Sequence, residues 1–346
     1  MAGANRASAG KRPRVRARLL LVLAALWLPA LAVSAQDIRF FRIGTGPIGG
    51  ANFAIGGLLA GAISNPPGSR ECERGGSCGV PGLIAVAQAT AGSVENVEKI
   101  GKGQLDGGLT QADIAFWAYY GAGLYTPAGA IHELRAVANL YADFVHLVVR
   151  ADSPINTVAD LRGKRVSLGE PGSGTLVDAQ MVLRAFRIEE ASLQPSYLRV
   201  GESLDRMLAG ELDALFQVGG VPTADIAELA QRLPVRLVPI AGPEIDALRA
   251  SQPFFTEATI PQDAYKGVSQ PVATIATGAL FVVSSKVDDD TVFGIAKALW
   301  HKNTRAVFDN GPPEAKRIQL GNALSTVPIP LHPGAERYYR EAKLLE

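Results

Sequence analysis

Two glycine-rich loops in this chain have the composition of an anion-binding turn. The first covers residues 44–50 and the second covers residues 169–175. Glycine lets the backbone approach a ligand closely, and the free N–H groups at a helix start carry partial positive charge. Ser173 and Thr175 add hydroxyl groups to the second loop. If a helix follows each loop, each is expected to bind a negatively charged group; the alternative is that each is simply a tight turn.

The same two short sequence motifs follow each loop, which indicates an internal duplication. Gly-x-Leu-Asp occurs at residues 103–106 and 210–213, and Ala-Asp-Ile-Ala at residues 112–115 and 224–227. Short matches between frequent residue types also arise by coincidence, but here the order and the surroundings repeat as well. Two lobes that face one cleft would bring both loops to a single ligand.

The order of apolar and glycine-rich segments predicts an α/β fold. Residues 38–43 are expected to form a strand that leads into the first loop, and residues 52–63 the helix behind it. Further strands are expected at residues 83–87, 105–110, 135–140, 144–150, 165–168, 197–200, 214–218, 235–240 and 274–283. Further helices are expected at residues 94–100, 114–120, 176–186 and 203–208.

Three polar residues take positions that matter for binding in this arrangement. Ser93 and Asp113 immediately precede two of the expected helices, so each is expected to cap the helix with its side chain. The expected strand at residues 105–110 delivers Gln111 to its C-terminal edge, where ligands bind in open α/β sheets.

The first residues have the pattern of a secretory signal peptide. Lys and Arg residues between positions 11 and 18 precede an apolar run from Leu19 to Val33, and a small residue follows at Ala35. This order predicts cleavage near Ala35 and a periplasmic protein, with residues 1–35 removed. A retained anchor is the alternative, but the run is shorter than the roughly 20 residues that a membrane span needs.

Charge and length limit the possible partners and set the domain number. The chain has 34 Lys and Arg against 33 Asp and Glu; the predicted signal peptide holds six of the basic residues and none of the acidic ones, which leaves 28 against 33. No basic stripe for nucleic acid is visible in that mature sequence. Its length favours two domains.

The chain has two cysteines, Cys72 and Cys78, within a loop rich in proline and glycine. In an exported protein this pair predicts a disulfide that closes a small surface loop. The alternative is a pair of metal ligands. The four histidines are scattered along the sequence, so we expect none of them to complete a tetrahedral metal site.

Motifs for other chemistry are incomplete. Residues 44–49 match the dinucleotide pattern Gly-x-Gly-x-x-Gly, but the acidic residue expected about twenty positions later falls in the cysteine loop. Residues 172–174 lack the wider frame of a nucleophilic serine. Residues 288–290 carry three carboxylates, which are more typical of a solvated helix start than of a calcium loop. We therefore expect no enzyme, no cofactor and no metal.

Taken together, seven segments resemble the TAXI-type solute receptors of TRAP transporters, in order and over nearly all of the mature chain. These segments are residues 43–46 with 49–50, 92–97, 111–115, 160–167, 171–175, 220–223 and 332–335. The resemblance implies a two-lobed periplasmic-binding-protein fold of type II, with a mixed sheet flanked by helices in each lobe and a ligand cleft between the lobes.

The resemblance also implies a function and a set of partners. A receptor of this family binds a small organic anion, with glutamate and 2-oxoglutarate as examples, and delivers it to membrane TRAP subunits without an ATPase. By position, the ligand-binding residues would be Gly49, Gly50, Asn52, Phe53, Ser93, Asn96, Gln111, Asp113, Gly172, Ser173, Gly174, Thr175 and Gly220. Ala51-Asn52-Phe53 departs from the family's usual Thr-Tyr-Tyr, which leaves the ligand's identity open.

The strands expected near residue 140 and residue 275 would carry the chain between the lobes. The first lobe would hold residues 36–140 and 275–346, and the second lobe residues 141–274. Two other functions remain open at this point: a ligand-sensing subunit for a membrane signalling partner, and a secreted hydrolase with Ser173 as nucleophile.

Overall fold

The computed structural model describes residues 1, 3, 38–48 and 50–346. The predicted signal peptide lies outside these residues apart from positions 1 and 3, and Gly49 of the first loop lies outside them too. Residues 38–346 form one compact unit. Within the described part of the chain, no helix combines the length and the apolar composition needed to cross a membrane.

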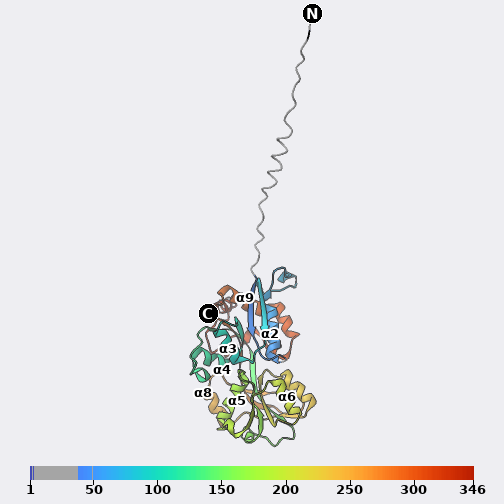
Figure 1. Cartoon of the computed structure of the whole chain (residues 1–346), viewed down its shortest axis with the longest axis vertical. Coiled ribbons are helices and arrows are strands. Elements are labelled where there is room, and N and C mark those ends of the chain that lie inside the picture. Colours follow the sequence, from blue (N-terminus) through green and yellow to red (C-terminus); the bar gives the residue numbers. More distant parts are fainter. Residues whose placement is uncertain (2, 4–37, 49) are drawn as a thin grey trace. The chain divides into compact units, whose positions relative to one another are not determined.

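A mixed sheet runs through this unit (Figure 1), in the order β4-β1-β5-β12-β6-β9-β7-β8, with β10 paired to β6 and β11 to β12. The strands are β1 (Arg39–Gly44), β2 (Ser64–Asn65), β3 (Val80–Pro81), β4 (Leu83–Gln88), β5 (Gly107–Gln111), β6 (Leu134–Arg150), β7 (Arg165–Ser167), β8 (Gln194–Ser196), β9 (Ala214–Gly219), β10 (Val235–Leu237), β11 (Thr256–Ile260) and β12 (Val272–Ser284). Strands β2 and β3 form a separate pair.

Helices flank the sheet, which confirms the predicted fold class. They are α2 (Ala51–Ile63), α3 (Ser93–Gly101), α4 (Ala112–Tyr120), α5 (Gly174–Ala185), α6 (Val200–Leu208), α7 (Ala224–Arg232), α8 (Pro243–Ser251), α9 (Asp289–Leu299), α10 (Lys302–Asp309), α11 (Pro313–Arg317) and α12 (Pro333–Glu341). Short 3-10 turns are η1 (Cys72–Arg74), η2 (Gly123–Tyr125), η3 (Val158–Leu161), η4 (Glu190–Ser192) and η5 (Leu320–Asn322).

The sheet has two parallel portions joined by antiparallel strands. Strands β4, β1 and β5 are parallel neighbours and pack against α2, α3 and α4; we call this the β1 side. Strands β8, β7 and β9 are parallel neighbours with α5, α6 and α7, and we call this the β7 side. Figure 1 shows α2 and α3 toward one end of the sheet, and α5 and α6 toward the other. The long strand β6 joins them, because it pairs with β12 and with β9.

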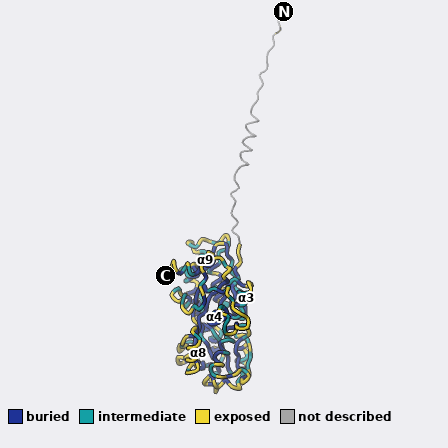
Figure 2. The backbone as a smooth tube through the Cα atoms, turned by 90° about the vertical axis from the view of Figure 1, so that its left-hand side faces the viewer, coloured by how far each residue is buried: buried dark blue, intermediate teal, exposed yellow. Residues whose placement is uncertain are grey.

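Apolar side chains of both sides form the core. One cluster surrounds Phe281 and Tyr339 on the β1 side, a second surrounds Leu215 and Ile226 on the β7 side, and a third extends across both. Figure 2 shows the buried backbone in the interior and the exposed residues along the outer helices and loops. Because one cluster crosses between the sides, the lobe boundaries near residues 140 and 275 stay a prediction.

The aspartate of the repeated Gly-x-Leu-Asp motif has the same structural role in both copies. Asp106 accepts hydrogen bonds from the Arg42 backbone N–H at 2.8 Å and from its guanidinium at 2.9 Å. Asp213 binds Arg165 in the same way, through the backbone N–H at 2.8 Å and through the guanidinium. Each pair ties the first strand of a side, β1 or β7, to the segment before the next parallel strand. The structure therefore supports the duplication.

Replacing Asp213 with asparagine is expected to lower the free energy of unfolding by about 1–2 kcal/mol at pH 7. The variant loses the bidentate salt bridge to the Arg165 guanidinium, at a partly exposed position. The Arg165 guanidinium lowers the pKa of Asp213, so this contribution is present above the carboxylate's unfolded pKa and is lost as the pH falls through its folded pKa. Urea unfolding measures the change. The exposed Asp205→Asn should stay within about 0.5 kcal/mol, and an equal loss there would contradict the assignment.

Three expectations about the elements were wrong or incomplete. Residues 197–200 do not form a strand, because β8 ends at Ser196 and the apolar face of α6 begins at Val200. The strands expected at residues 135–140 and 144–150 are one strand, β6, since residues 141–143 continue the extended backbone. Helix α8 and strand β11 were not expected at all.

Candidate functional site

A cavity of ≈ 80 Å³ lies where the two sides of the sheet meet. It is lined by segments of the β1 side, by β6 and by segments of the β7 side. Predicted site residues that line it are Gly50, Asn52, Ser93, Gln111, Ser173, Gly174 and Thr175. Lining residues that were not predicted as ligand-binding include Asp143 and Gln217, and also Glu170 and Thr223 from segments that the sequence had singled out.

Both glycine-rich loops reach this cavity, each in front of a helix. In the first loop Gly50 is the residue before α2, and no side chain caps that helix. Asn52 in the first turn of α2 accepts a hydrogen bond from the Tyr141 hydroxyl at 2.8 Å. Because Tyr141 lies on β6, this contact fixes the start of α2 against the strand that joins the two sides.

The second loop caps α5 and leaves two backbone donors available. The Ser173 hydroxyl accepts from the Leu176 N–H at 3.1 Å and donates to the Glu170 carbonyl oxygen at 2.6 Å. The hydrogen bonds found among the described residues do not include the N–H groups of Gly174 and Thr175. Those two groups are therefore the donors that the helix start offers to a ligand.

Ser93 and Asp113 do not cap their helices, so both capping predictions were wrong. Ser93 is already the first residue of α3, behind Gly92 at a φ of 130° that favours glycine. Its hydroxyl donates to the Gln111 side-chain oxygen and accepts from the Gln111 N–H, both at 3.2 Å. Asp113 lies inside α4, which begins at Ala112, and is fully buried.

A direct contact between the two sides takes the place of a cap on α3. The Gly172 carbonyl oxygen, in the second loop, accepts hydrogen bonds from the N–H groups of Val94 and Glu95, both at 3.1 Å. Gly172 has a φ of 88° and lies against Ala91 and Glu95. The N-terminus of α3 is thus occupied by protein in this arrangement, and it offers fewer free N–H groups to a ligand than expected.

Five predicted residues lie away from the cavity lining: Phe53, Asn96, Asp113, Gly172 and Gly220. The Asn96 amide donates to the carbonyl oxygens of Thr45 and Leu109, both at 2.8 Å, so it holds the first loop to β5. Gly220 packs against Glu314. Gly49 lies outside the described residues. The binding roles assigned from the sequence stay predictions for the whole set.

Acidic side chains give the cavity its electrostatic character. Asp143 on β6 is buried, and burial, with Glu314 and Asp113 nearby, raises its pKa to about 7. Burial also raises the pKa of Glu170, although Arg199 contacts that carboxylate at 3.0 Å. Neither Lys nor Arg is among the described residues that line the cavity. A single carboxylate within the apolar run of β6 was the sequence signal that could have identified Asp143.

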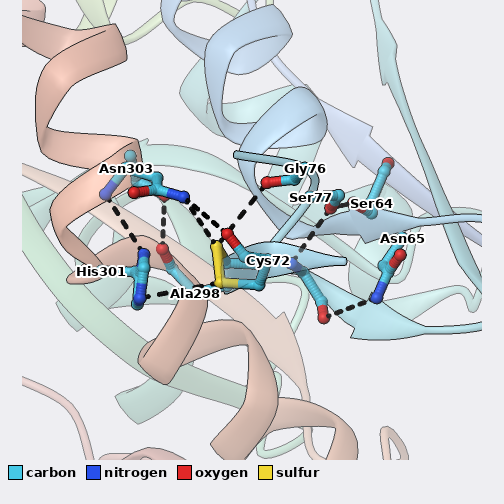
Figure 3. Close-up of a disulfide and its surroundings, with 11 residues drawn as sticks. Ser64, Asn65, Cys72, Gly76, Ser77, Ala298, His301 and Asn303 are labelled. Atoms are coloured by element: carbon cyan, nitrogen blue, oxygen red, sulfur yellow. Dashed lines mark hydrogen bonds between the residues drawn. A yellow bond between two sulfur atoms is a disulfide. The ribbon is translucent and has the colours of Figure 1, made fainter. Parts of the chain in front are cut away.

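The cysteine loop lies on the β1 side, apart from this cavity. Cys72 and Cys78 form a disulfide, as predicted, with a Cα separation of 4.7 Å. Figure 3 shows His301 and Asn303, at the start of α10, turned toward it: His301 Nε2 lies 3.7 Å from Cys72 Sγ, and the Asn303 amide donates to Cys78 Sγ at 3.2 Å. His301 is thus brought beside the disulfide although it lies 229 positions from Cys72 in the sequence. These contacts fasten the loop to the C-terminal helices.

Comparison with known families adds a classification to this geometry. The NMT1-like family matches residues 43–342, which is most of the chain. The chain belongs to the NMT1-like family. The match begins in β1 and ends just beyond α12, so it includes both sides of the sheet and the cavity between them.

Solved structures similar to this NMT1-like chain share its mixed α/β fold. A protein from Bordetella bronchiseptica RB50 is 11% identical, with a TM-score of 0.50 over 88% of this chain and 81% of that one. MatC from Rhodopseudomonas palustris with bound malate is 14% identical, with a TM-score of 0.49 over 89% and 97%. The periplasmic aliphatic sulphonate binding protein SsuA from Escherichia coli is 16% identical, with a TM-score of 0.42 over 88% and 84%. At such identities the likeness concerns the fold.

Proposed function

We propose that this chain is an extracytoplasmic solute receptor that closes its cavity over a small organic anion, a carboxylate such as glutamate or 2-oxoglutarate, and delivers it to membrane TRAP subunits. The observation that carries the proposal is the start of α5: Gly174 and Thr175 line a cavity that both sides of the sheet form, and their N–H groups have no hydrogen-bond partner among the described residues. Such a helix start attracts a negatively charged group.

The cavity would hold an anion with neutral donors and not with a cationic side chain. Thr175 and Gln217 add a hydroxyl and an amide to the two backbone N–H groups. Asp143 can act as a further donor while it carries a proton, which its raised pKa of about 7 favours below neutral pH. Hydrogen bonds to a charged group, together with exclusion of water, supply the free energy of a micromolar complex, about 8 kcal/mol.

A hydrolase with Ser173 as nucleophile receives no support from the hydrogen bonds of that residue. Its hydroxyl bonds to the Glu170 carbonyl oxygen and to the Leu176 N–H, which is the arrangement of a helix cap. A general base would have to accept the hydroxyl proton that the Glu170 carbonyl oxygen takes here. Receptor function therefore fits this serine better than catalysis.

A thermal-shift panel of organic acids and amino acids tests the proposed function. A true solute at 100 times its dissociation constant should stabilise the folded protein by about 2.7 kcal/mol, which raises its melting temperature. Isothermal titration calorimetry should then give heat with the same solutes. If amines stabilise the protein and carboxylates do not, the anion assignment is wrong. If neither class produces a shift or heat, binding of a small solute in this cavity is wrong as well.

A further inference from the structure

A pair of buried carboxyl groups lies directly behind the cavity wall. Asp178 on α5 is fully buried, and its Oδ2 accepts a hydrogen bond at 2.6 Å from the side-chain amide of Gln111, which lines the cavity. Its other oxygen, Oδ1, has no partner among the described residues. Asp113 on α4 is also fully buried; its Oδ1 accepts from Thr277 at 3.4 Å, and its Oδ2 has no partner among them either.

The two carboxyl groups are neighbours around one side chain: Gln111, which donates to Asp178 at 2.6 Å, lies two positions before Asp113. Burial, together with the negative charge of Asp113, raises the pKa of Asp178. Two ionised carboxylates offer acceptors alone and repel. One proton held between them turns one carboxyl into a donor and removes one of the two negative charges, as in other buried carboxyl pairs. Burial and the unpartnered oxygens therefore favour one proton shared between Asp113 and Asp178. We call these two residues the carboxyl pair.

The surroundings of the carboxyl pair favour that proton. The titratable neighbours are Asp143 on β6, whose negative charge acts on the pair, and Tyr125 on η2. The polar neighbours are Gln111 on β5 and Thr277 on β12. No ion pair joins either carboxyl to a cationic side chain of the described residues. Burial raises the pKa of Asp113 to about 6 and raises that of Asp178 in the same direction.

The carboxyl pair connects the two sides of the sheet. Asp113 belongs to the β1 side and Asp178 to the β7 side, and the Gln111 contact crosses between them in the same place. Movement of the two sides apart would return both carboxyl groups to water, where each ionises near pH 4. In the arrangement that the structure shows, which the proposal takes as the closed form, both carboxyl groups are fully buried.

We propose that the carboxyl pair couples solute binding to uptake of one proton from water: the closed form takes a proton between Asp113 and Asp178, and the pair then positions Gln111 at the cavity. This inference rests on the proposed function, because the closed form is the one that holds the solute. Asp113 and Asp178 are thus positioning residues that act through Gln111. Proton uptake also offsets the negative charge that an anionic solute brings to an acidic cavity.

A measurement without solute tests the shared proton itself. Urea unfolding between pH 5 and pH 8 gives the number of protons that the folded state binds beyond the unfolded state, from the pH slope of the free energy of unfolding. This number should be larger by about one in the wild type than in Asp178→Asn, because the new amide N–H replaces the shared proton. Asp225→Asn is the matched control, because Asp225 is the repeat counterpart of Asp113 and has no carboxyl partner on α5. Its own pKa is raised to about 6, so this variant should lose proton binding below about pH 7 and match the wild type between about pH 7 and pH 8, where the loss in Asp178→Asn must persist. Asp113→Asn replaces Asp178→Asn if the latter does not fold.

A second measurement tests the coupling to binding, with 2-oxoglutarate, glutamate and malonate as probes. In the wild type and in Asp225→Asn, the dissociation constant of a bound probe should rise about tenfold from pH 6.5 to pH 7.5. In Asp178→Asn the rise over this range should be about tenfold smaller than in the wild type while binding persists, because any contribution of Asp143 is common to both proteins. Equal pH dependence in Asp178→Asn and wild type, in either measurement, overturns the inference. Absence of heat with every probe would count against the proposed carboxylate function, and the urea measurement would still decide the shared proton.

Discussion

Alanine in place of Gly174 is expected to weaken solute binding by about a hundredfold, equivalent to about 2.7 kcal/mol. Gly174 begins α5, and a Cβ there would overlap the Gln111 side-chain oxygen and come within 3.0 Å of the Ser93 hydroxyl. Gln111 cannot simply yield, because its amide is held by Asp178 at 2.6 Å. The closed arrangement would therefore be strained while the β7 side itself keeps its fold. Calorimetry with the solute found in the thermal-shift panel measures the loss.

Gly57→Ala serves as the matched control for this prediction. Gly57 lies on the exposed face of α2, where a Cβ meets nothing within 4 Å. Alanine favours a helix over glycine by about 1 kcal/mol, so this variant should be slightly more stable and bind as the wild type does. Wild-type affinity in Gly174→Ala would mean that the close approach of α5 to Gln111 is not part of the bound state.

Replacing Asp143 with asparagine is expected to stabilise the protein at pH 8, on the order of 4 kcal/mol, and to change little at pH 4. Burial, with Glu314 and Asp113 nearby, raises the pKa of Asp143 to about 7, above the value near 4 of an unfolded chain. Between these values the folded state binds more protons than the unfolded state, so the free energy of unfolding falls as the pH rises. Asparagine cannot ionise and removes this loss.

Urea unfolding of wild type and Asp143→Asn at pH 4, 6 and 8 measures this difference directly. The exposed Asp205→Asn controls for the removal of one negative charge and should follow the wild type at each pH. Two parallel stability profiles for wild type and Asp143→Asn would show that Asp143 does not hold its proton in the folded state. The same variant in calorimetry shows whether the Asp143 side chain also contributes to solute binding.

Local patterns predicted the repeated unit of the fold correctly because they act over short distances. A strand, a glycine-rich loop and a helix follow one another in β1 and α2 and again in β7 and α5, since glycine conformation and apolar periodicity are properties of a few neighbouring residues. The paired Asp106 and Asp213 have matching roles for the same reason: each lies just before the strand that pairs with its arginine. The disulfide between Cys72 and Cys78 also follows from a spacing of six residues.

The same local reasoning failed where a polar group forms its hydrogen bonds with a distant segment of the chain. Ser93 had the sequence position of a cap, yet its hydroxyl bonds to Gln111, and the N–H groups behind it bond to Gly172. His301 gave no local sign that it would reach Cys72, 229 positions away. In each case the partner comes from another element, so its identity depends on how the whole sheet brings those elements together.

By itself, the sequence determined the α/β class, the duplicated glycine loops and the disulfide, because backbone preference, apolar periodicity and cysteine spacing are encoded within each short segment. Its resemblance to the TAXI-type receptors named seven of the residues that line the cavity. Tertiary structure alone decided that Asp143 lines the cavity and that Asp113 and Asp178 are buried together behind it, around Gln111. These carboxyl groups come from β6, α4 and α5, and their unusual protonation follows from shared burial, which arises only when the packed sides exclude water.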